Sequence, residues 1–183
     1  MTAARETTMA NERNKDRHLK NAQRFYRKEQ WSDAIHEYEA AARLDPNDVR
    51  MFLKLGELYQ KMNEFGRAVQ SFRSAAEIYA RQGFYLKAVA VLKQVLKLDP
   101  QQIDVNVKLA ELYFALGLVS DAMTQYQLVA EHHQVNGRSQ EALTMLQKIV
   151  ELDPNNVPMR IKLCEELARQ GRREEALTGY RAI

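Results

Sequence analysis

The sequence predicts an all-α fold, a helical solenoid of about ten antiparallel helices. The 183 residues include only 7 glycines and 4 prolines and are rich in strong helix formers. The tripeptide Leu-Asp-Pro occurs three times, at a constant spacing of 54 residues. Residues 49–102 and 103–156 align without a gap and share 14 identities. Such self-similarity indicates a repeat protein built from one duplicated unit.

The repeats divide the chain into segments. A proline cannot continue a helix, so Pro46, Pro100 and Pro154 are each expected to follow a helix end. A further copy begins at Val157 and is incomplete at Ile183. Before the first copy, residues 1–14 lack apolar periodicity and are expected to form a disordered basic leader. The expected helical array covers residues 15–48, 49–102, 103–156 and the incomplete 157–183.

The residue sizes within each unit resemble the tetratricopeptide repeat, a helix-turn-helix of about 34 residues. That family has a bulky residue at its fourth position, a leucine and a small residue at seven and eight, and an aromatic residue at eleven. Small residues follow at twenty and twenty-seven, with a bulky residue between them. Residues 49–82 match this pattern with Phe52, Leu55, Gly56, Tyr59, Ala68, Phe72 and Ala75.

The unit departs from the family pattern in having three helices. The 49–82 repeat has Ala80 where the family has proline, so the helix from about 65 to 82 is expected to belong to two hairpins. The helix at 119–136 is expected to do the same. Three-helix units of this kind resemble repeats of bacterial scaffold proteins. The resemblance implies a concave surface, formed by the first helix of each hairpin, that holds a segment of a partner protein.

Two kinds of side chain are candidates for that surface. Lysines at Lys54, Lys108 and Lys162 are each followed three residues later by a glutamate. These pairs are either solvated helix pairs, worth about 0.2–0.5 kcal/mol each, or the walls of a polar groove. Tyr26 and Phe114 are either partly buried or aromatic anchors for a partner. The predicted site residues are Tyr26, Lys54, Glu57, Lys61, Lys108, Glu111, Phe114, Lys162 and Glu165.

No catalytic, metal or cofactor site is expected. Adjacent His132 and His133 point about 100° apart on a helix and do not chelate one metal ion. Cys164 occupies a small-residue position of the repeat, and the acidic pair Glu165-Glu166 is expected to be solvated. Motifs for phosphate binding, zinc hydrolysis and nucleophilic serine are absent from the sequence. We therefore expect a protein that is not an enzyme.

The charge distribution bears on the partner. The formal net charge of +3 lies within residues 1–24, and the remaining basic and acidic side chains balance. A neutral array disfavours nucleic acid as a partner. No apolar run reaches the roughly 18 residues of a membrane span, and residues 1–20 lack the apolar core of a secretion signal. The cytoplasm is the expected compartment.

The expected function is that of a scaffold or adaptor that binds another protein or peptide segment. One alternative is a secretion-type chaperone that cradles an export substrate, and a less favoured one is an RNA-binding helical repeat. The array stops within a hairpin at residues 180–183. The chain is therefore expected to be part of a longer repeat protein, or to form a homo-oligomer through its open C-terminal end.

Overall fold

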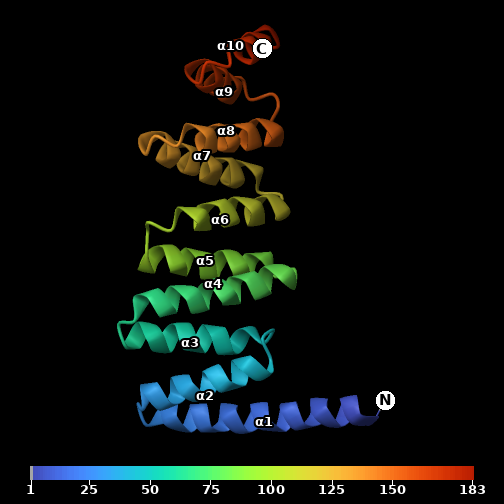
Figure 1. Ribbon diagram of the computed structural model, residues 1–183, viewed down its shortest axis with the longest axis vertical. Helices are drawn as coiled ribbons and strands as arrows, with labels where there is room; N and C mark the ends of the chain where they lie inside the picture. The colour runs from blue at the N-terminus through green and yellow to red at the C-terminus, as the bar shows by residue number, and fades with distance from the viewer. Residues whose placement is uncertain (1) are drawn as a thin grey trace. The chain divides into compact units, whose positions relative to one another are not determined.

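The computed structural model describes the backbone of residues 2–183 and the side chains of residues 9–183, and these residues form ten α-helices and no strand (Figure 1). The contacts divide the chain into two compact units, residues 1–100 and 101–183. This all-α architecture of stacked helices confirms the predicted fold class. Within the described residues, no helix is long and apolar enough to span a membrane.

The first unit contains five helices, in which each helix runs antiparallel to the one before it (Figure 1). Helix α4 packs against both α3 and α5, so it belongs to two hairpins as the sequence predicted. The predicted helix at about 65–82 is observed at Phe65–Arg81. The helices are α1 (Thr2–Arg27), α2 (Trp31–Leu44), α3 (Val49–Lys61), α4 (Phe65–Arg81) and α5 (Tyr85–Leu98).

The second unit repeats the arrangement of three helices and adds a hairpin. Helix α7 packs against α6 and α8, while α9 packs against α8 and α10. The helix predicted at 119–136 is observed at Val119–Val135. The helices are α6 (Ile103–Ala115), α7 (Val119–Val135), α8 (Ser139–Leu152), α9 (Val157–Arg169) and α10 (Arg173–Arg181).

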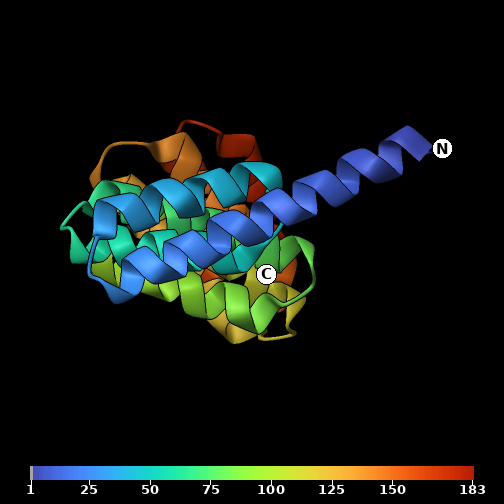
Figure 2. The same cartoon turned by 90° about the horizontal axis from the view of Figure 1, so that it is seen from below.

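The N-terminal segment differs from the expectation. We expected residues 1–14 to be disordered, whereas the structure continues α1 back to Thr2; Met1 lies outside the described residues. Residues 9–14 are exposed and packing begins at Lys15, so this part of α1 projects beyond the helices of its unit (Figure 2). The missing apolar periodicity of residues 1–14 accounts for the exposure of residues 9–14. It did not predict the helix, which needs only helix-forming residues continuous with a packed helix.

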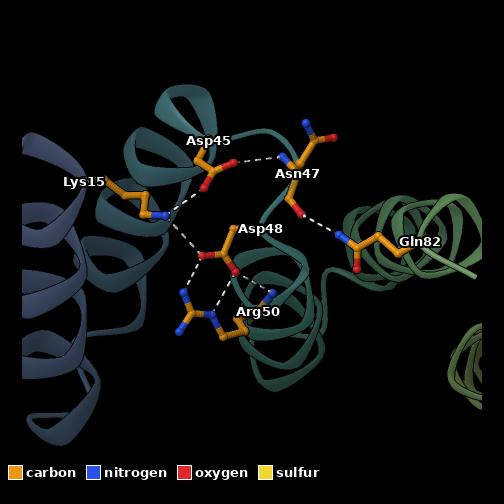
Figure 3. A network of polar contacts seen from close by, with 6 residues as sticks. All are labelled: Lys15, Asp45, Asn47, Asp48, Arg50 and Gln82. Atoms are coloured by element: carbon orange, nitrogen blue, oxygen red, sulfur yellow. Dashed lines mark hydrogen bonds and ion pairs between the residues drawn. The ribbon is translucent and has the colours of Figure 1, made fainter. Parts of the chain in front are cut away.

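A polar network joins α1 to the turn between α2 and α3 (Figure 3). The ammonium group of Lys15 lies 2.7 Å from Asp45 and 3.4 Å from Asp48. Asp48 caps α3 by accepting a hydrogen bond from the backbone N–H of Arg50, and its carboxylate also pairs with the Arg50 side chain at 2.6 Å. From the far end of α4, the Gln82 amide donates to the backbone carbonyl of Asn47 at 3.4 Å. The Leu-Asp-Pro turn thus connects three helices.

Close helix packing depends on small residues at the hairpin crossings. A methyl group added to Gly56 in α3 would lie 2.6 Å from the ring of Phe72 in α4, and this ring is 1% exposed. The corresponding residue of α6, Ala110, is 0% exposed, and that of α9, Cys164, is 3% exposed. The tetratricopeptide-like pattern of small and bulky residues therefore describes direct contacts in the core.

We predict that Gly56→Ala lowers the free energy of unfolding by about 1–3 kcal/mol, because the methyl group overpacks against a ring that has no room to move. Gly66→Ala is the matched control. It also adds a methyl group to a helix, but nothing lies within 4 Å of the new carbon, so a gain of a few tenths to about 1 kcal/mol is expected from helix propensity. Urea unfolding measures both, and equal midpoints would contradict the packing account.

The polar network predicts a pH dependence. The Arg50 side chain, with a smaller contribution from Lys15, lowers the pKa of Asp48 to about 2 from its ordinary 3.8. The folded state therefore binds this proton less readily than the unfolded state. Its stabilisation is present above pH 4 and is lost as the pH falls toward 2. Asp48→Asn keeps a capping side chain but removes the charge, so thermal unfolding should show a smaller loss of stability between pH 6 and pH 3 than the unchanged protein shows.

Candidate partner-binding surfaces

Four of the predicted site residues gather in the first unit, where the C-terminal ends of α1 and α3 lie beside the start of α2. The ammonium nitrogen of Lys61 is 5.0 Å from the ring centroid of Tyr26 and 4.3 Å from that of Trp31. The Lys54 nitrogen is 5.7 Å from the Tyr26 ring. We call Tyr26, Trp31, Lys54, Glu57 and Lys61 the aromatic–lysine cluster. It holds cations over ring faces, an attraction worth about 0.5–1 kcal/mol at exposed sites.

Lys54 and Glu57 form an ion pair within α3. Their charged atoms are 2.7 Å apart, and the side chains are 44% and 42% exposed. The hydrogen bond to Glu57 raises the pKa of Lys54. An exposed pair of this kind contributes little to stability. Both charged groups are therefore accessible to a partner, and separating them to bind it would cost little stability.

Tyr26 is partly buried. Partial burial was one of the two alternatives for this residue, and the other was an aromatic anchor for a partner. Its ring meets Trp31 edge-on at a centroid distance of 5.3 Å. Trp31 is not among the predicted site residues, yet its ring supplies the face over which the Lys61 ammonium lies. One feature of the sequence could have indicated Trp31 as a member of this cluster: it is an aromatic residue five positions after Tyr26, across the turn between α1 and α2.

In the second unit, a groove of about 160 Å³ lies between α7 and α9. We call it the α7–α9 groove. The predicted residues Lys162 and Glu165 line it from α9, and Ala130 and Leu146 supply apolar lining. Its remaining lining residues, which the sequence prediction missed, are Gln127, Glu131, Gln134 and Arg169.

The double role of α7 explains why the sequence prediction missed its groove residues. Helix α7 is the second helix of one hairpin and the first helix of the next, because it packs against both α6 and α8. In that second role it contributes to the surface of first helices, as α9 does. The register that places residues 119–136 at the start of a hairpin was visible in the sequence and would have indicated Gln127, Glu131 and Gln134.

A buried carboxylate connects the two walls of the α7–α9 groove. Glu166 in α9 is 3% exposed, although it was expected to be solvated. It accepts hydrogen bonds from the side-chain amides of Gln134 in α7 and of Gln170, the residue that follows α9, both at 3.2 Å. The Arg169 guanidinium lies 3.5 Å from it. Glu166 therefore positions both Gln134 and Arg169 at the groove.

Helix α6 presents the remaining predicted residues. Lys108 and Glu111 form an exposed ion pair with a separation of 3.2 Å. Phe114 is 55% exposed, so partial burial, one of its two alternatives, does not account for it. The structure thus brings Lys108 and Glu111 together and presents Phe114 as an accessible aromatic ring on the same helix.

His133 is partly buried and Cys164 is buried, so both are packing residues, whereas His132 is exposed. The rings of His132 and His133 are 5.9 Å apart and edge-to-face, and burial lowers the pKa of His133. Cys164 is 3% exposed, and burial raises the pKa of its thiol. Among the described side chains, residues 9–183, no cluster of three or more His, Cys, Asp or Glu could hold a metal ion.

The ten helices and their pairwise packing define an α-helical repeat protein. Three family models, two described as "Tetratricopeptide repeat" and one as "TPR repeat", match residues 79–139, 49–82 and 22–63. The chain is a tetratricopeptide repeat protein. Residues 128–183 also match a model described as "Bacterial transcriptional activator domain".

This chain matches only part of each of its longer relatives. A "TPR repeat-containing protein" of Treponema pallidum is 30% identical over 94 residues, which are 51% of this chain and 12% of the relative. DnaJ homolog subfamily C member 3 of Gallus gallus is 22% identical over 167 residues, 81% of this chain and 32% of the relative. The chain thus spans less than a third of the length of these relatives.

Two solved structures show the range of the structural matches. A MamA protein is 16% identical with a TM-score of 0.33, and the match covers 92% of this chain and 88% of MamA. The TPR2B domain of yeast Sti1, solved in a complex described as "TPR2B-domain:pHsp70-complex", is 12% identical with a TM-score of 0.42. That match covers 78% of this chain and 98% of the domain.

The buried carboxylate gives a stability prediction. Glu166→Ala should lower the free energy of unfolding by about 1–3 kcal/mol, because Gln134 and Gln170 lose a buried acceptor. Glu165→Ala removes the neighbouring exposed carboxylate, which has no such partners, and should change stability by less than about 0.5 kcal/mol. Chemical denaturation of both variants tests this. A loss in Glu165→Ala equal to that in Glu166→Ala would contradict the assigned role.

Proposed function

We propose that this protein is a scaffold or adaptor that binds an extended segment of a partner protein along the surfaces of its first helices. The α7–α9 groove is the observation that carries the proposal. It combines apolar lining from Ala130 and Leu146 with charged and amide side chains from both walls. Binding sites that recognise a segment by shape and by a few placed polar groups have this composition.

The chemistry of the groove suits a polypeptide. The amides of Gln127 and Gln134 offer both donors and acceptors to a peptide backbone. Lys162 and Arg169 attract acidic side chains, and Glu131 and Glu165 attract basic ones. The matching segment therefore has a small apolar side chain flanked by charges of both signs.

Each unit offers a further contact area for a partner. On α6, exposed Phe114 is suited to act as an anchor, because aromatic residues at the centre of an interface are each worth about 2 kcal/mol or more. In the first unit, the aromatic–lysine cluster offers Lys54, Glu57 and Lys61 around Tyr26. The proposed compartment is the cytoplasm, and the unpaired Cys164 is consistent with a reducing environment.

The groove is tested with peptides selected from a random displayed library on the purified protein. We predict that Lys162→Ala weakens the selected peptides about threefold to tenfold and that Lys162→Glu weakens them further, because a partner carboxylate loses its cation and then meets an acid. Fluorescence anisotropy with labelled peptides measures the dissociation constants. Peptides lacking acidic residues are the internal comparison and should tolerate both substitutions.

Arg173→Ala is the matched control, since it removes an exposed cation that does not line the groove. It should leave the affinities unchanged. Selected peptides that bind every Lys162 variant as tightly as the unchanged protein would reject the groove as the binding site. Selection of single-stranded RNA over peptide in a parallel library would favour the RNA-binding alternative.

A further inference from the structure

Helix α1 carries a basic stripe that the proposed function does not use. Successive residues of an α-helix turn by about 100° and rise by about 1.5 Å, so five basic side chains lie within an arc of about 80° over about 21 Å. On the opposite side of the helix, Ala22 is 0% exposed, so the stripe faces away from its unit. The five exposed side chains of the stripe are Arg13, Arg17, Lys20, Arg24 and Arg27.

The outer side of α1 is uncovered in the first unit. Figure 2 shows α1 crossing in front of the other helices of the unit, with α2 on its inner side. The aromatic–lysine cluster is elsewhere on α1, because Tyr26 lies about 140° around the helix from Arg13. The stripe and the cluster are therefore separate surfaces of one helix.

The charges of the stripe are not neutralised within the described side chains. None of its five members forms an ion pair with a carboxylate of residues 9–183, and the contact made by Arg24 is with the ring of Phe25 at 5.1 Å. Lys15 on the same helix is different, since it pairs with Asp45 and Asp48. Asp16 flanks the stripe and is exposed, leaving five cations beside one acid.

The stripe also contains a hollow. A pocket of about 270 Å³ is lined by five side chains, of which four are cations and one is an amide. No acidic side chain lines it, so an anion entering the pocket meets donors on every side. The lining residues are Lys20, Gln23, Arg24, Arg27 and Lys28.

We propose that the basic stripe docks an acidic segment of a partner protein, with glutamate or aspartate at every third or fourth position. Four of the five cations are arginines, and the planar guanidinium group forms paired hydrogen bonds with a carboxylate. A partner helix with this acid spacing places its carboxylates about 5–6 Å apart, which matches the spacing of the stripe.

The surroundings of the stripe favour this occupant over two other anionic ones. A helix that lies in a membrane surface presents a broad apolar face, whereas Met9 is the one large apolar side chain exposed on the described part of α1. Proteins that bind single-stranded nucleic acid stack bases on open aromatic rings. The two aromatic rings of α1, Phe25 and Tyr26, are partly buried.

The test uses a labelled helical peptide with glutamates at every third or fourth position, and a scrambled peptide of the same composition. Binding is measured by fluorescence anisotropy at about 0.15 M ionic strength. The triple variant Arg17→Glu, Arg24→Glu and Arg27→Glu should weaken the patterned peptide about tenfold or more, because each lost exposed pair becomes a repulsion. The unchanged protein should prefer the patterned peptide to the scrambled one.

The control variant carries the same change in net charge at three exposed positions outside α1, Lys97→Glu, Arg138→Glu and Arg181→Glu. It should keep the affinity of the unchanged protein, and circular dichroism should show equal helicity in both triple variants. Lys162→Glu, which alters the α7–α9 groove, should also leave this binding unchanged, so failure of the groove and failure of the stripe are separate results.

Three outcomes would overturn the proposal. The first is equal weakening in the two triple variants, which would show an effect of net charge alone. The second is equal affinity for the patterned and scrambled peptides, or binding of neither. The third is tighter binding of single-stranded RNA or of vesicles containing phosphatidylserine than of the patterned peptide, lost in the α1 triple variant, which would assign the stripe to phosphate groups.

Discussion

Neighbouring helices approach each other closely because small residues at their crossings leave room for bulky ones. Gly56 leaves room for the ring of Phe72, and Ala110 and Cys164 are buried at the equivalent positions. Because these crossings bury one side of each helix, they also determine which side remains for other molecules. The accessible charged surfaces are therefore consequences of packing, since they occupy sides of the helices that the crossings leave free.

Polar contacts connect particular helices within each unit, in addition to this packing. Lys15, Asp45 and Asp48 connect α1 to the turn that follows α2, and Glu166 connects α7 to α9. In each connection a charged side chain has several polar partners. Removing such a side chain therefore costs more stability than removing an exposed pair such as Lys54–Glu57. The second connection lies beside the α7–α9 groove, so the residue that stabilises the unit also positions side chains proposed to meet a partner.

The fold was largely predictable, and the candidate surfaces were predictable in part. The spacing of Leu-Asp-Pro and the size pattern indicated ten helices, and the absence of proline near Ala80 indicated that α4 serves two hairpins. The lysine–glutamate pairs of α3 and α6 were also predicted and are observed. Trp31 and Glu131 were missed, because a repeat pattern assigns one role to each position, whereas α7 and the α1–α2 turn have two. Arg169 was missed because its place at the groove depends on the burial of Glu166.

The repeat, its register, the helix ends before the three Leu-Asp-Pro prolines and the excess of positive charge near the N-terminus follow from the amino-acid sequence alone. These properties depend on local rules, namely proline geometry, helix propensity and residue size. The burial of Glu166 beside the exposed Glu165 became visible only once the helices were packed. The same is true of the five cations of the basic stripe, which share one outward side without acidic partners among the described side chains of residues 9–183. Both depend on which side chains from distant helices approach each other, and such distances are set by packing between elements.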